Sequence, residues 1–319
     1  MSTVVVGPVL APEGRPAQAV KAKGSRAVSY WIYLLPMLIG TTVVVLVPFG
    51  YNVYLSFFHW KGGLAPMRFS GLDNYKNLMV DGQFWSGFGN SLFMIVGIVI
   101  IPTILGLILA SSLFDYISKQ FNDTVASVLR ALLYLPQIVP IAVAGIIWSW
   151  VLATQNGVLN SVLQAMGVSS LPDWLGNPDI AIYAVMLMVM WLQLGYPVVI
   201  FMSALERVDP ALYEAAALDG AGWWWRFFAI TIPQIRPEIF VVMLTATISA
   251  LKVFAPVLIL TMGGPEGSTV VPSFYAYRNF FELSKVGYGS TISTVMSVLI
   301  IVIAWVMLWF QRRNLTEEA

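Results

Sequence analysis

The chain has 319 residues, a length that suggests two domains in a soluble protein, but 58% of the residues are hydrophobic and only 10% are charged. This composition, with a mean hydropathy of +0.79, predicts a membrane protein that contacts lipid. Seventeen basic and sixteen acidic residues give a net charge of +1, so no broad basic field exists to bind nucleic acid. The chain has no cysteine, which excludes disulfides and thiolate-held metals, and its one histidine, His59, is too little for a histidine metal site.

Six charge-poor stretches are each long enough to cross a bilayer, which takes about 20 apolar residues. They are 30–58, an apolar centre at 92–113, 131–152, 180–205, 239–260 and 292–310. Their apolar runs show no period-two alternation, and a spanning segment must satisfy its backbone hydrogen bonds internally. The sequence therefore predicts an all-α polytopic membrane protein with six transmembrane helices. Prolines inside the first five spans predict kinked helices. They are Pro36, Pro48, Pro102, Pro136, Pro140, Pro197 and Pro256.

The placement of lysine and arginine predicts the orientation, because positive loops stay in the cytoplasm. With the amino terminus inside, eleven basic residues lie inside, namely Arg15, Lys21, Lys23, Arg26, Lys119, Arg130, Arg207, Arg226, Arg236, Arg312 and Arg313. Five lie outside, namely Lys61, Arg68, Lys76, Arg278 and Lys285. Both termini are thus predicted to be cytoplasmic.

Segments outside the spans follow from this topology. We expect a mobile cytoplasmic tail at 1–29, a leading helix at 30–58 that stays as an anchor, an external loop at 59–87 and a cytoplasmic carboxyl terminus at 312–319. His59 and the aromatics of the external loops are typical of residues at the membrane interface, and contact with a docking protein stays open for the aromatics.

A polar cytoplasmic segment, 206–238, separates the fourth and fifth spans and reads as ordered. Asp209 followed by Pro210 predicts a helix start, with the helix running from Ala211 to Asp219 and ending at Gly220 in left-handed geometry. A second short helix is predicted at 223–230, ending before the proline at 233. A pair of amphipathic helices on the membrane surface, anchored by three consecutive tryptophans at 223–225, is the alternative interpretation.

The residues of this segment resemble a known motif. Glu214-Ala215-Ala216, three residues, Gly220, nine residues, and then Ile230-Thr231-Ile232-Pro233 resemble the EAA loop of binding-protein-dependent ABC importer permeases. The family pattern has leucine where this chain has Ile232. Five other segments resemble the carbohydrate-uptake branch, and within it the first permease subunit of maltose, lactose or glycerol-phosphate importers. These segments are Gly71 to Tyr75, Leu135-Pro136, Trp174 to Gly176, Ala250 to Phe254 and Met262 to Pro265.

The resemblance implies a type I ABC importer permease fold, with a core at 88–311 and a cytoplasmic coupling loop at 206–238. It implies a prokaryotic inner-membrane protein that pairs with a second permease as a heterodimer, with two cytoplasmic ATPase subunits and with an extracytoplasmic solute-binding protein. The residues implied to couple to the ATPase are Glu214, Ala215, Ala216, Asp219, Gly220, Ile230 and Pro233.

Nucleotide chemistry is assigned to the partners. The dipeptide Gly-Lys, which a Walker A motif requires, never occurs in the chain. We therefore expect no cofactor and no enzymatic activity in this chain, with ATP and Mg bound by the ATPase subunits.

Polar residues in the spans predict a solute path. Thr245, Ser249 and Lys252 lie at spacings of four and three on the fifth span, and Gln193 and Tyr196 lie on the fourth. A lysine at mid-bilayer costs about 2.5–3.5 kcal/mol, so Lys252 is expected to face a water-filled cavity or a partner. Pairing with an acidic group of the partner, or with a carbonyl freed by the proline at 256, stays open. Ser290, Thr294 and Ser297 of the sixth span are better explained as packing contacts between helices.

Hydroxyl and amide groups along this path suit sugar hydroxyls. The resemblance to the carbohydrate-uptake branch implies a sugar as the solute, with a non-sugar such as glycerol phosphate as the alternative. An ion-coupled carrier would want carboxylates within the spans, and their apolar centres hold no Asp or Glu. A membrane enzyme lacks a candidate nucleophile, metal site or buried acid.

Overall fold

The computed structural model describes residues 27–114 and 123–317. Most of the tail predicted to be mobile lies outside these residues, and so does Lys119. The described chain forms two compact units, which divide between Gly50 and Tyr51. The first unit is a continuous helix built from α1 (Ala27–Thr41), the π-helical turn η1 (Thr42–Leu46) and the first residues of α2 (Val47–Ser56).

The second unit is almost wholly helical. Its strands β1 (Phe58–His59) and β2 (Arg68–Phe69) pair antiparallel. Its first helices are α3 (Asp73–Met79), α4 (Gly82–Ile95), η2 (Val96–Ile100), α5 (Ile101–Ser112), α7 (Asp123–Ile138), α8 (Ile141–Val151), α9 (Val158–Ala165), α10 (Ala181–Gln193) and α11 (Gly195–Leu205). Then follow α12 (Pro210–Leu218), α13 (Trp223–Arg226), η4 (Phe227–Thr231), α14 (Ile232–Gln234), α15 (Arg236–Leu251), α16 (Ala255–Leu260), α17 (Pro272–Tyr277), η5 (Arg278–Glu282) and α18 (Val286–Glu317).

Four helices in the described part of the chain are long and apolar enough to cross a membrane. They are Ile32–Ser56, Gly82–Ser112, Ala181–Leu205 and Val286–Arg313. Two helix pairs pass the same test together but are bent, Ser127–Ile138 with Ile141–Val151 by 97° and Trp223–Gln234 with Arg236–Leu251 by 74°. The count is therefore four, or six if each bent pair is one span.

The third predicted span, 131–152, is not a straight helix. It breaks before Pro140, which has extended backbone (φ −55°, ψ 132°) and precedes α8. A proline has no amide hydrogen to continue the helical bonding and clashes with the preceding turn. The bend agrees with the kink predicted from the prolines of this span, whereas its size of 97° did not follow from the sequence.

The predicted bounds of the fifth span, 239–260, are wrong. The helix α15 starts at Arg236 and ends at Leu251, and α16 begins only at Ala255 with Pro256 in its first turn. The second loop helix also differs, because the helical segment runs from Trp223 through Pro233 to Gln234 instead of stopping before the proline. The π-helical turn η4 directly precedes Ile232 and Pro233, so the helical bonding is already irregular where the proline amide is missing.

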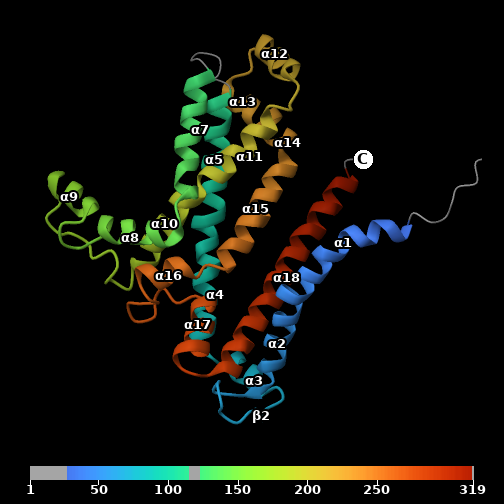
Figure 1. Ribbon diagram of the computed structural model, residues 1–319. Helices are drawn as coiled ribbons and strands as arrows, with labels where there is room; N and C mark the ends of the chain where they lie inside the picture. Colours follow the sequence, from blue (N-terminus) through green and yellow to red (C-terminus); the bar gives the residue numbers. More distant parts are fainter. Residues whose placement is uncertain (1–26, 115–122, 318–319) are drawn as a thin grey trace, which may run out of the picture. The chain divides into compact units, whose positions relative to one another are not determined.

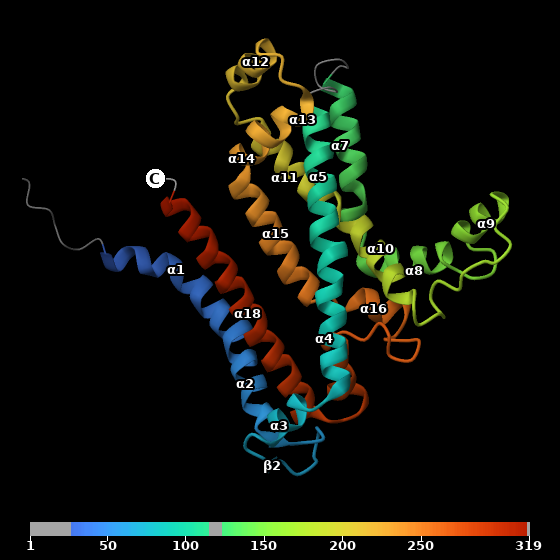
Figure 2. The ribbon, with the colours of Figure 1, turned by 180° about the vertical axis from the view of Figure 1, so that it is seen from behind.

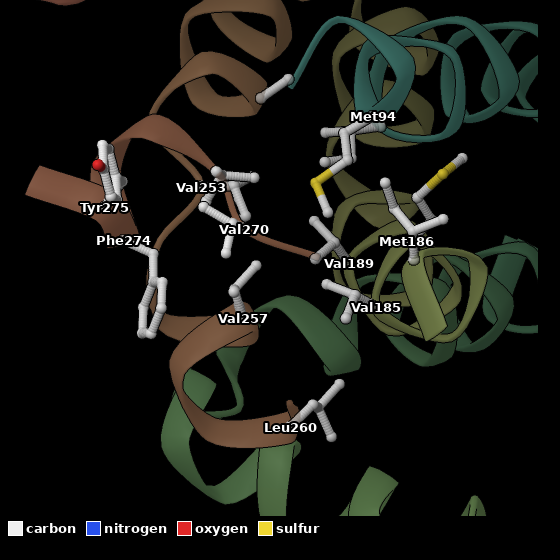
Figure 3. Packing of buried hydrophobic residues seen from close by; sticks show 14 of the residues in the cluster. Met94, Val185, Met186, Val189, Val253, Val257, Leu260, Val270, Phe274 and Tyr275 are labelled. Carbon is white, nitrogen blue, oxygen red and sulfur yellow. The ribbon is translucent and has the colours of Figure 1, made fainter. Parts of the chain in front are cut away.

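Two hydrophobic clusters form the core of the second unit. The first joins α4, α10, α16 and α17, and Figure 3 shows Met94, Val185, Val257 and Phe274 packed within it. The second joins α5 and α11 to the segment between α11 and α15, through Phe201, Tyr213 and Phe227 among others. In both ribbon views α7, α12 and α13 lie at one end of the second unit, and α3, β2 and α17 lie at the opposite end (Figure 1, Figure 2).

Buried polar side chains fix the end that carries α3. Asn74 is buried and donates from Nδ2 to the carbonyls of Ser56 (2.9 Å) and Phe58 (3.0 Å). The Ser56 hydroxyl also lies 2.6 Å from the Tyr75 hydroxyl. The segment Gly71 to Tyr75 therefore holds the end of α2 and the start of β1, because its side chains satisfy backbone and hydroxyl groups there.

Asp81 joins three elements at the same end. Its Oδ1 accepts from the backbone amides of Gln83 and Phe84 at the start of α4, and its Oδ2 accepts from the hydroxyls of Tyr275 (2.8 Å) and Tyr288 (2.5 Å). Burial raises the pKa of Asp81, but the hydrogen bonds from the tyrosines and amides outweigh it, so the pKa lies below its ordinary value. Burial and the neighbouring Asp81 charge raise the pKa of Tyr275 to about 12.

We predict that Asp81→Asn lowers the free energy of unfolding by about 1–2 kcal/mol, because the amide nitrogen that replaces the charged Oδ2 cannot accept from the hydroxyls of Tyr275 and Tyr288, although asparagine keeps the cap. The folded-state pKa of Asp81 lies below the unfolded value, so its contribution is complete above about pH 5 and is lost as pH falls through the folded pKa. Thermal unfolding in detergent should therefore show a smaller difference between wild type and variant below about pH 4.

Asp73→Asn is the matched control, because Asp73 makes only an exposed ion pair with Lys76 in the same helix. It should change the melting temperature little. An Asp81→Asn protein as stable as wild type at neutral pH would contradict the anchoring role.

Candidate coupling loop and polar cavity

The loop between α11 and α15, 206–238, carries the helix predicted at 211–219. That helix is present as α12, Pro210–Leu218, one residue earlier at each end. The Asp209 carboxylate accepts from the Ala211 amide at 2.9 Å, which is the predicted N-cap. We call residues 206–238 the coupling loop.

The end of α12 is a glycine-dependent turn. Gly220 has φ +77°, and the Ala221 amide donates to the Ala216 carbonyl (2.9 Å) while the Gly220 amide donates to the Ala217 carbonyl (3.1 Å). These two bonds define a Schellman cap, in which the residue after the cap adopts left-handed geometry. An added Cβ at Gly220 would meet nothing within 4 Å, so backbone conformation, not space, selects glycine here.

The coupling residues implied by the resemblance divide between two faces of the loop. Ala216 is buried, and it packs on the same inward side as Tyr213. Ile230 is half-buried. The remaining coupling residues are exposed, namely Glu214, Ala215, Asp219, Gly220 and Pro233. The exposed set presents two carboxylates and small side chains at the end of the unit.

A buried hydrogen bond ties the two halves of the loop together. The Tyr213 hydroxyl lies 3.0 Å from the Thr231 hydroxyl, and both residues are buried. Tyr213 also contacts the ring of Phe114 at the end of α5, with 6.2 Å between the centroids. The sequence analysis gave neither residue a role, although a tyrosine at the inward position of a predicted amphipathic helix is a signal for such a contact.

The tryptophans of the loop differ in environment. Trp223 is half-buried and stacks on Phe227, with ring centroids 5.1 Å apart. Trp224 and Trp225 are each 58% exposed. The membrane-surface alternative for the exposed pair therefore stays a prediction, whereas Trp223 belongs to the packing of the loop.

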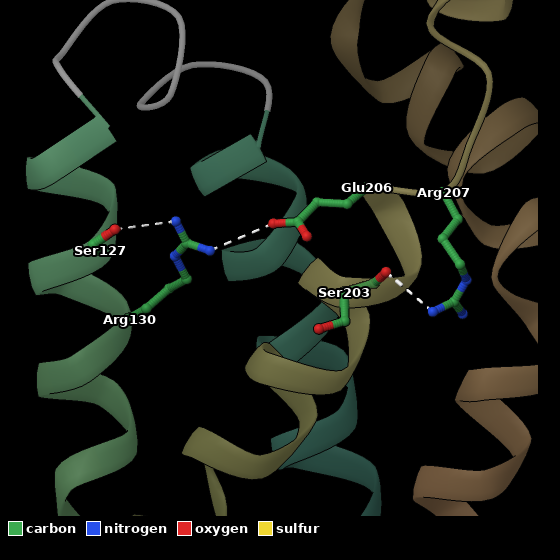
Figure 4. Close-up of polar contacts among 5 residues, drawn as sticks. All are labelled: Ser127, Arg130, Ser203, Glu206 and Arg207. Atoms are coloured by element: carbon green, nitrogen blue, oxygen red, sulfur yellow. Dashed lines mark hydrogen bonds and ion pairs between the residues drawn. The ribbon is translucent and has the colours of Figure 1, made fainter.

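Ion pairs link the coupling loop and its neighbours at this end. The Arg130 guanidinium of α7 lies 3.4 Å from the Glu206 carboxylate and donates to the Ser127 hydroxyl at 3.3 Å (Figure 4). Arg207 donates to the Ser203 carbonyl at 3.2 Å and pairs with Glu238 at the start of α15. Exposed pairs of this kind contribute at most about 1 kcal/mol each, so packing carries most of the stability.

A polar cavity of about 220 Å³ lies among α5, α7, α10, α11 and α15. Its lining residues are Ile98, Thr103, Gln137, Gln193, Tyr196, Pro197, Thr245, Ala246 and Ser249. Four of the five predicted solute-path residues are thus brought together, and two polar residues that the sequence analysis missed, Thr103 and Gln137, join them. Helices α7 and α11 approach closely near it, since a Cβ on Gly195 would lie 2.5 Å from the Leu133 carbonyl oxygen.

Two polar atoms of this cavity have no hydrogen-bond partner within the described residues. They are Thr103 Oγ1, on a side chain that is 5% exposed, and Gln137 Oε1. The hydroxyls of Thr245 and Ser249 donate to carbonyls of their own helix, 2.8 Å to Val241 and 2.9 Å to Thr245, and keep their lone pairs. Thr103 and Gln137 each directly follow a proline inside a predicted span. A polar residue next to a helix kink was the sequence signal that could have identified them. The cavity can donate to and accept from a polar ligand.

Lys252 is the exception among the predicted path residues. It is exposed, it follows the last residue of α15 instead of lying within the helix, and it is not among the cavity lining. Its ammonium makes no hydrogen bond or ion pair with any described residue, so the alternative of a bond to a carbonyl freed by Pro256 is absent there, while a partner's acidic group stays a prediction. The helix ends there because Pro256 cannot donate to the Lys252 carbonyl.

The described residues hold no metal-binding cluster. No group of three or more His, Asp or Glu residues there could hold a metal ion.

Comparison with known proteins identifies a family that this chain matches over most of its length. The family model described as "Binding-protein-dependent transport system inner membrane component" matches residues 102–315. The chain belongs to this family. The family predicted from the EAA motif is therefore confirmed, and the match covers the coupling loop and all of the cavity lining except Ile98.

Individual relatives are similar to this permease over most of its length. The chain is 31% identical to the probable ABC transporter permease protein YurN of Bacillus subtilis, over 90% of this chain and 97% of that protein. It is 32% identical to the trehalose/maltose transport system permease protein MalF of Thermococcus litoralis, over 88% of this chain and 92% of that protein. The crystal structure of a bacterial alginate ABC transporter, in complex with an alginate pentasaccharide-bound periplasmic protein, contains a similar chain with TM-score 0.78 and 22% identity. That match covers 91% of this chain and 96% of the other.

We predict that the Tyr213–Thr231 hydrogen bond stabilises the coupling loop. Tyr213→Phe and Thr231→Val should each destabilise α12 by about 0.5–1.5 kcal/mol, because each removes one member of a buried hydrogen bond. The double variant should cost less than the sum of the two, which is the mark of a direct interaction.

Hydrogen–deuterium exchange of the α12 amides measures this effect locally. Tyr75→Phe, which removes the hydroxyl of another part-buried tyrosine at the opposite end, is the control and should leave α12 exchange unchanged. Strictly additive effects in the double variant would contradict the direct bond.

Proposed function

We propose that this permease forms half of the translocation path of an ATP-driven sugar importer in a prokaryotic plasma membrane. It pairs with a second permease, receives solute from an extracytoplasmic solute-binding protein, and is driven by two cytoplasmic ATPase subunits that bind ATP and Mg. In this proposal the bent pair Ser127–Ile138 with Ile141–Val151 is one span, and α15 belongs to another, while Trp223–Gln234 stays in the coupling loop. This gives six spans, with both termini and the coupling loop in the cytoplasm. The predicted distribution of eleven basic residues inside and five outside supports this orientation.

One observation carries the coupling proposal, which is that the loop shares a hydrophobic core with the spans. Tyr213 and Phe227 of the loop pack in one cluster with Leu107 of α5 and Phe201 of α11. Close-packed clusters transmit displacement instead of absorbing it. A partner that moves the loop therefore moves α5 and α11 with it.

The outward face of α12 suits a protein groove. Glu214 offers a carboxylate for a charge-assisted hydrogen bond, and the small Ala215 lets a partner approach the helix closely. The Schellman turn at Gly220 then directs the chain back toward the spans. These features support docking on an ATPase, with energy delivered as a rigid displacement of the loop.

The polar cavity supports a sugar as the solute. Its hydroxyl and amide groups match sugar hydroxyls, and Tyr196 offers an aromatic ring. A cavity of about 220 Å³ lies below the roughly 300–1,000 Å³ of common ligand sites, and Thr245 and Ser249 on its rim are exposed. A second permease facing α15 would complete the enclosure. The likeness to a relative named for trehalose and maltose transport favours the same solute class.

Coupling is tested by Glu214→Ala in the complete complex. We expect the ATPase to copurify poorly and solute-stimulated ATP hydrolysis to fall at least about tenfold, because a charge-assisted bond contributes about 1.5–3 kcal/mol. Glu282→Ala is the matched control, an exposed glutamate at the opposite end that pairs only with Arg278. Wild-type copurification and hydrolysis in the Glu214→Ala complex would remove the coupling assignment.

The solute class is tested by binding a panel of sugars to the cognate solute-binding protein, because selection begins there. The sugar that binds should be accumulated by proteoliposomes that contain the full complex and internal ATP. Accumulation driven by an ion gradient without ATP would contradict the importer.

The cavity assignment is tested by Thr103→Val. We expect uptake of that sugar to fall by about 3- to 10-fold, since one neutral hydrogen bond is worth about 0.5–1.5 kcal/mol. The variant should melt no lower than wild type, because the change replaces a buried hydroxyl that has no partner with a methyl of the same shape.

Ser111→Ala is the matched control, because Ser111 also has a buried unpartnered hydroxyl on α5 but lies outside the cavity lining. Its uptake should equal that of wild type. Equal losses of uptake in both variants would assign Thr103 to helix packing.

A further inference from the structure

A second pocket lies at the end of the unit opposite the coupling loop. It measures about 860 Å³, and it is formed by the chain between α2 and α4 together with α17 and the start of α18. Its charged lining residues are Lys61, Arg68, Asp81 and Lys285. We call it the loop pocket. It shares no lining residue with the polar cavity.

The basic residues at this end fall into two groups. Lys76 and Arg278, which lie outside the pocket, are paired with Asp73 (3.6 Å) and Glu282 (3.9 Å). By contrast, Lys61, Arg68 and Lys285 line the pocket and pair with no acidic group among the described residues. The cations without an internal partner are therefore those that converge on the pocket.

Asp81 does not neutralise these cations. Its two oxygens already accept four hydrogen bonds, two from tyrosine hydroxyls and two from backbone amides, and it makes no ion pair with the lysines or the arginine. With three positive charges and one negative charge, the lining has a net charge of +2 at neutral pH. The pocket thus presents a positive field at the surface.

The exposure of the pocket's basic side chains indicates a docking surface for a protein and not a site that encloses a small ligand. Lys61, Arg68 and Lys285 are all exposed, whereas a small-molecule pocket buries about 70–90% of its ligand and the groups that hold it. Exposed charges around a shallow rim act mainly on the rate of encounter between proteins. The loop pocket is also separate from the polar cavity, so it is not part of the proposed solute path.

We propose that the loop pocket receives acidic side chains of the extracytoplasmic solute-binding protein and accelerates its docking. The proposal rests on the proposed function, which puts this end of the unit outside the cell. Carboxylates of the partner supply the negative charges that Lys61, Arg68 and Lys285 lack within this chain. Asp81 and its two tyrosines hold the pocket floor in place between α4, α17 and α18.

The test compares two double variants in the complete importer, reconstituted in nanodiscs. Lys61→Gln with Lys285→Gln removes two pocket cations, and Lys76→Gln with Arg278→Gln removes two cations from the same end outside the pocket. Surface plasmon resonance measures association of the cognate solute-binding protein at about 50 mM and 500 mM salt, where the Debye length changes from about 14 Å to about 4 Å.

We expect the pocket variant to associate about tenfold more slowly than wild type at low salt, with the difference nearly gone at high salt. The control variant should remain within about twofold of wild type at both salts. All four side chains are exposed, so both variants should melt like wild type, which the same preparations will show.

Other outcomes overturn the proposal in distinguishable ways. Equal rates for wild type and both variants would reject the pocket while leaving the importer intact, whereas a wild-type complex that binds no solute-binding protein would reject the proposed function itself. An effect that disappears in nanodiscs without anionic lipid would assign the pocket to lipid phosphates. Slower uptake with unchanged association would assign it to an anionic solute.

Discussion

The packing of Tyr213 and Phe227 against α5 and α11 is the contact that fixes the coupling loop to the spans of this permease. A short loop helix at a membrane surface has few bonds of its own, and an isolated helix of nine residues is marginal in water. Here the loop is stable because its apolar side chains complete a cluster begun by the spans, and because the Tyr213–Thr231 bond closes the loop on itself. The same contacts that stabilise the loop make it move with the spans.

Prolines shape the path between this loop and the cavity. Helices in a membrane tolerate breaks only where neighbours or a cavity satisfy the freed backbone groups. The bend before Pro140 ends α7 close to the cavity, and Gln137, one turn earlier, turns a side chain into it. The chain also breaks where α15 ends, before Pro256. Irregular backbone therefore borders the polar cavity, where its cost is lowest.

The elements that could be predicted from sequence were those with local causes. Asp209 before a proline and Gly220 after a run of alanines predict the bounds of α12 within one residue, because caps depend on neighbouring residues only. Pro140 and Pro256 predict kinks, but the size of the bend before Pro140, the end of α15 at Leu251 and the place of Lys252 could not be predicted, since they depend on which packed helices surround each proline. Thr103 was missed for a related reason, because the preceding Pro102 marks a kink but does not tell which face of the helix the threonine lies on.

The two hydrophobic clusters meet at the polar cavity, and this arrangement explains how a pull at one end could open the other. Ile98 and Ala246 of the lining belong to the cluster that packs toward α17, whereas Tyr196 packs against the cluster that contains the coupling loop. On α15, Val242 lies in one cluster and Ala246, one turn later, in the other. Each cluster is closely packed and moves as a body, so relative motion concentrates at the boundary between them. The polar residues lie at that boundary, where a displacement of the loop changes the shape of the cavity with the least disturbance of either core.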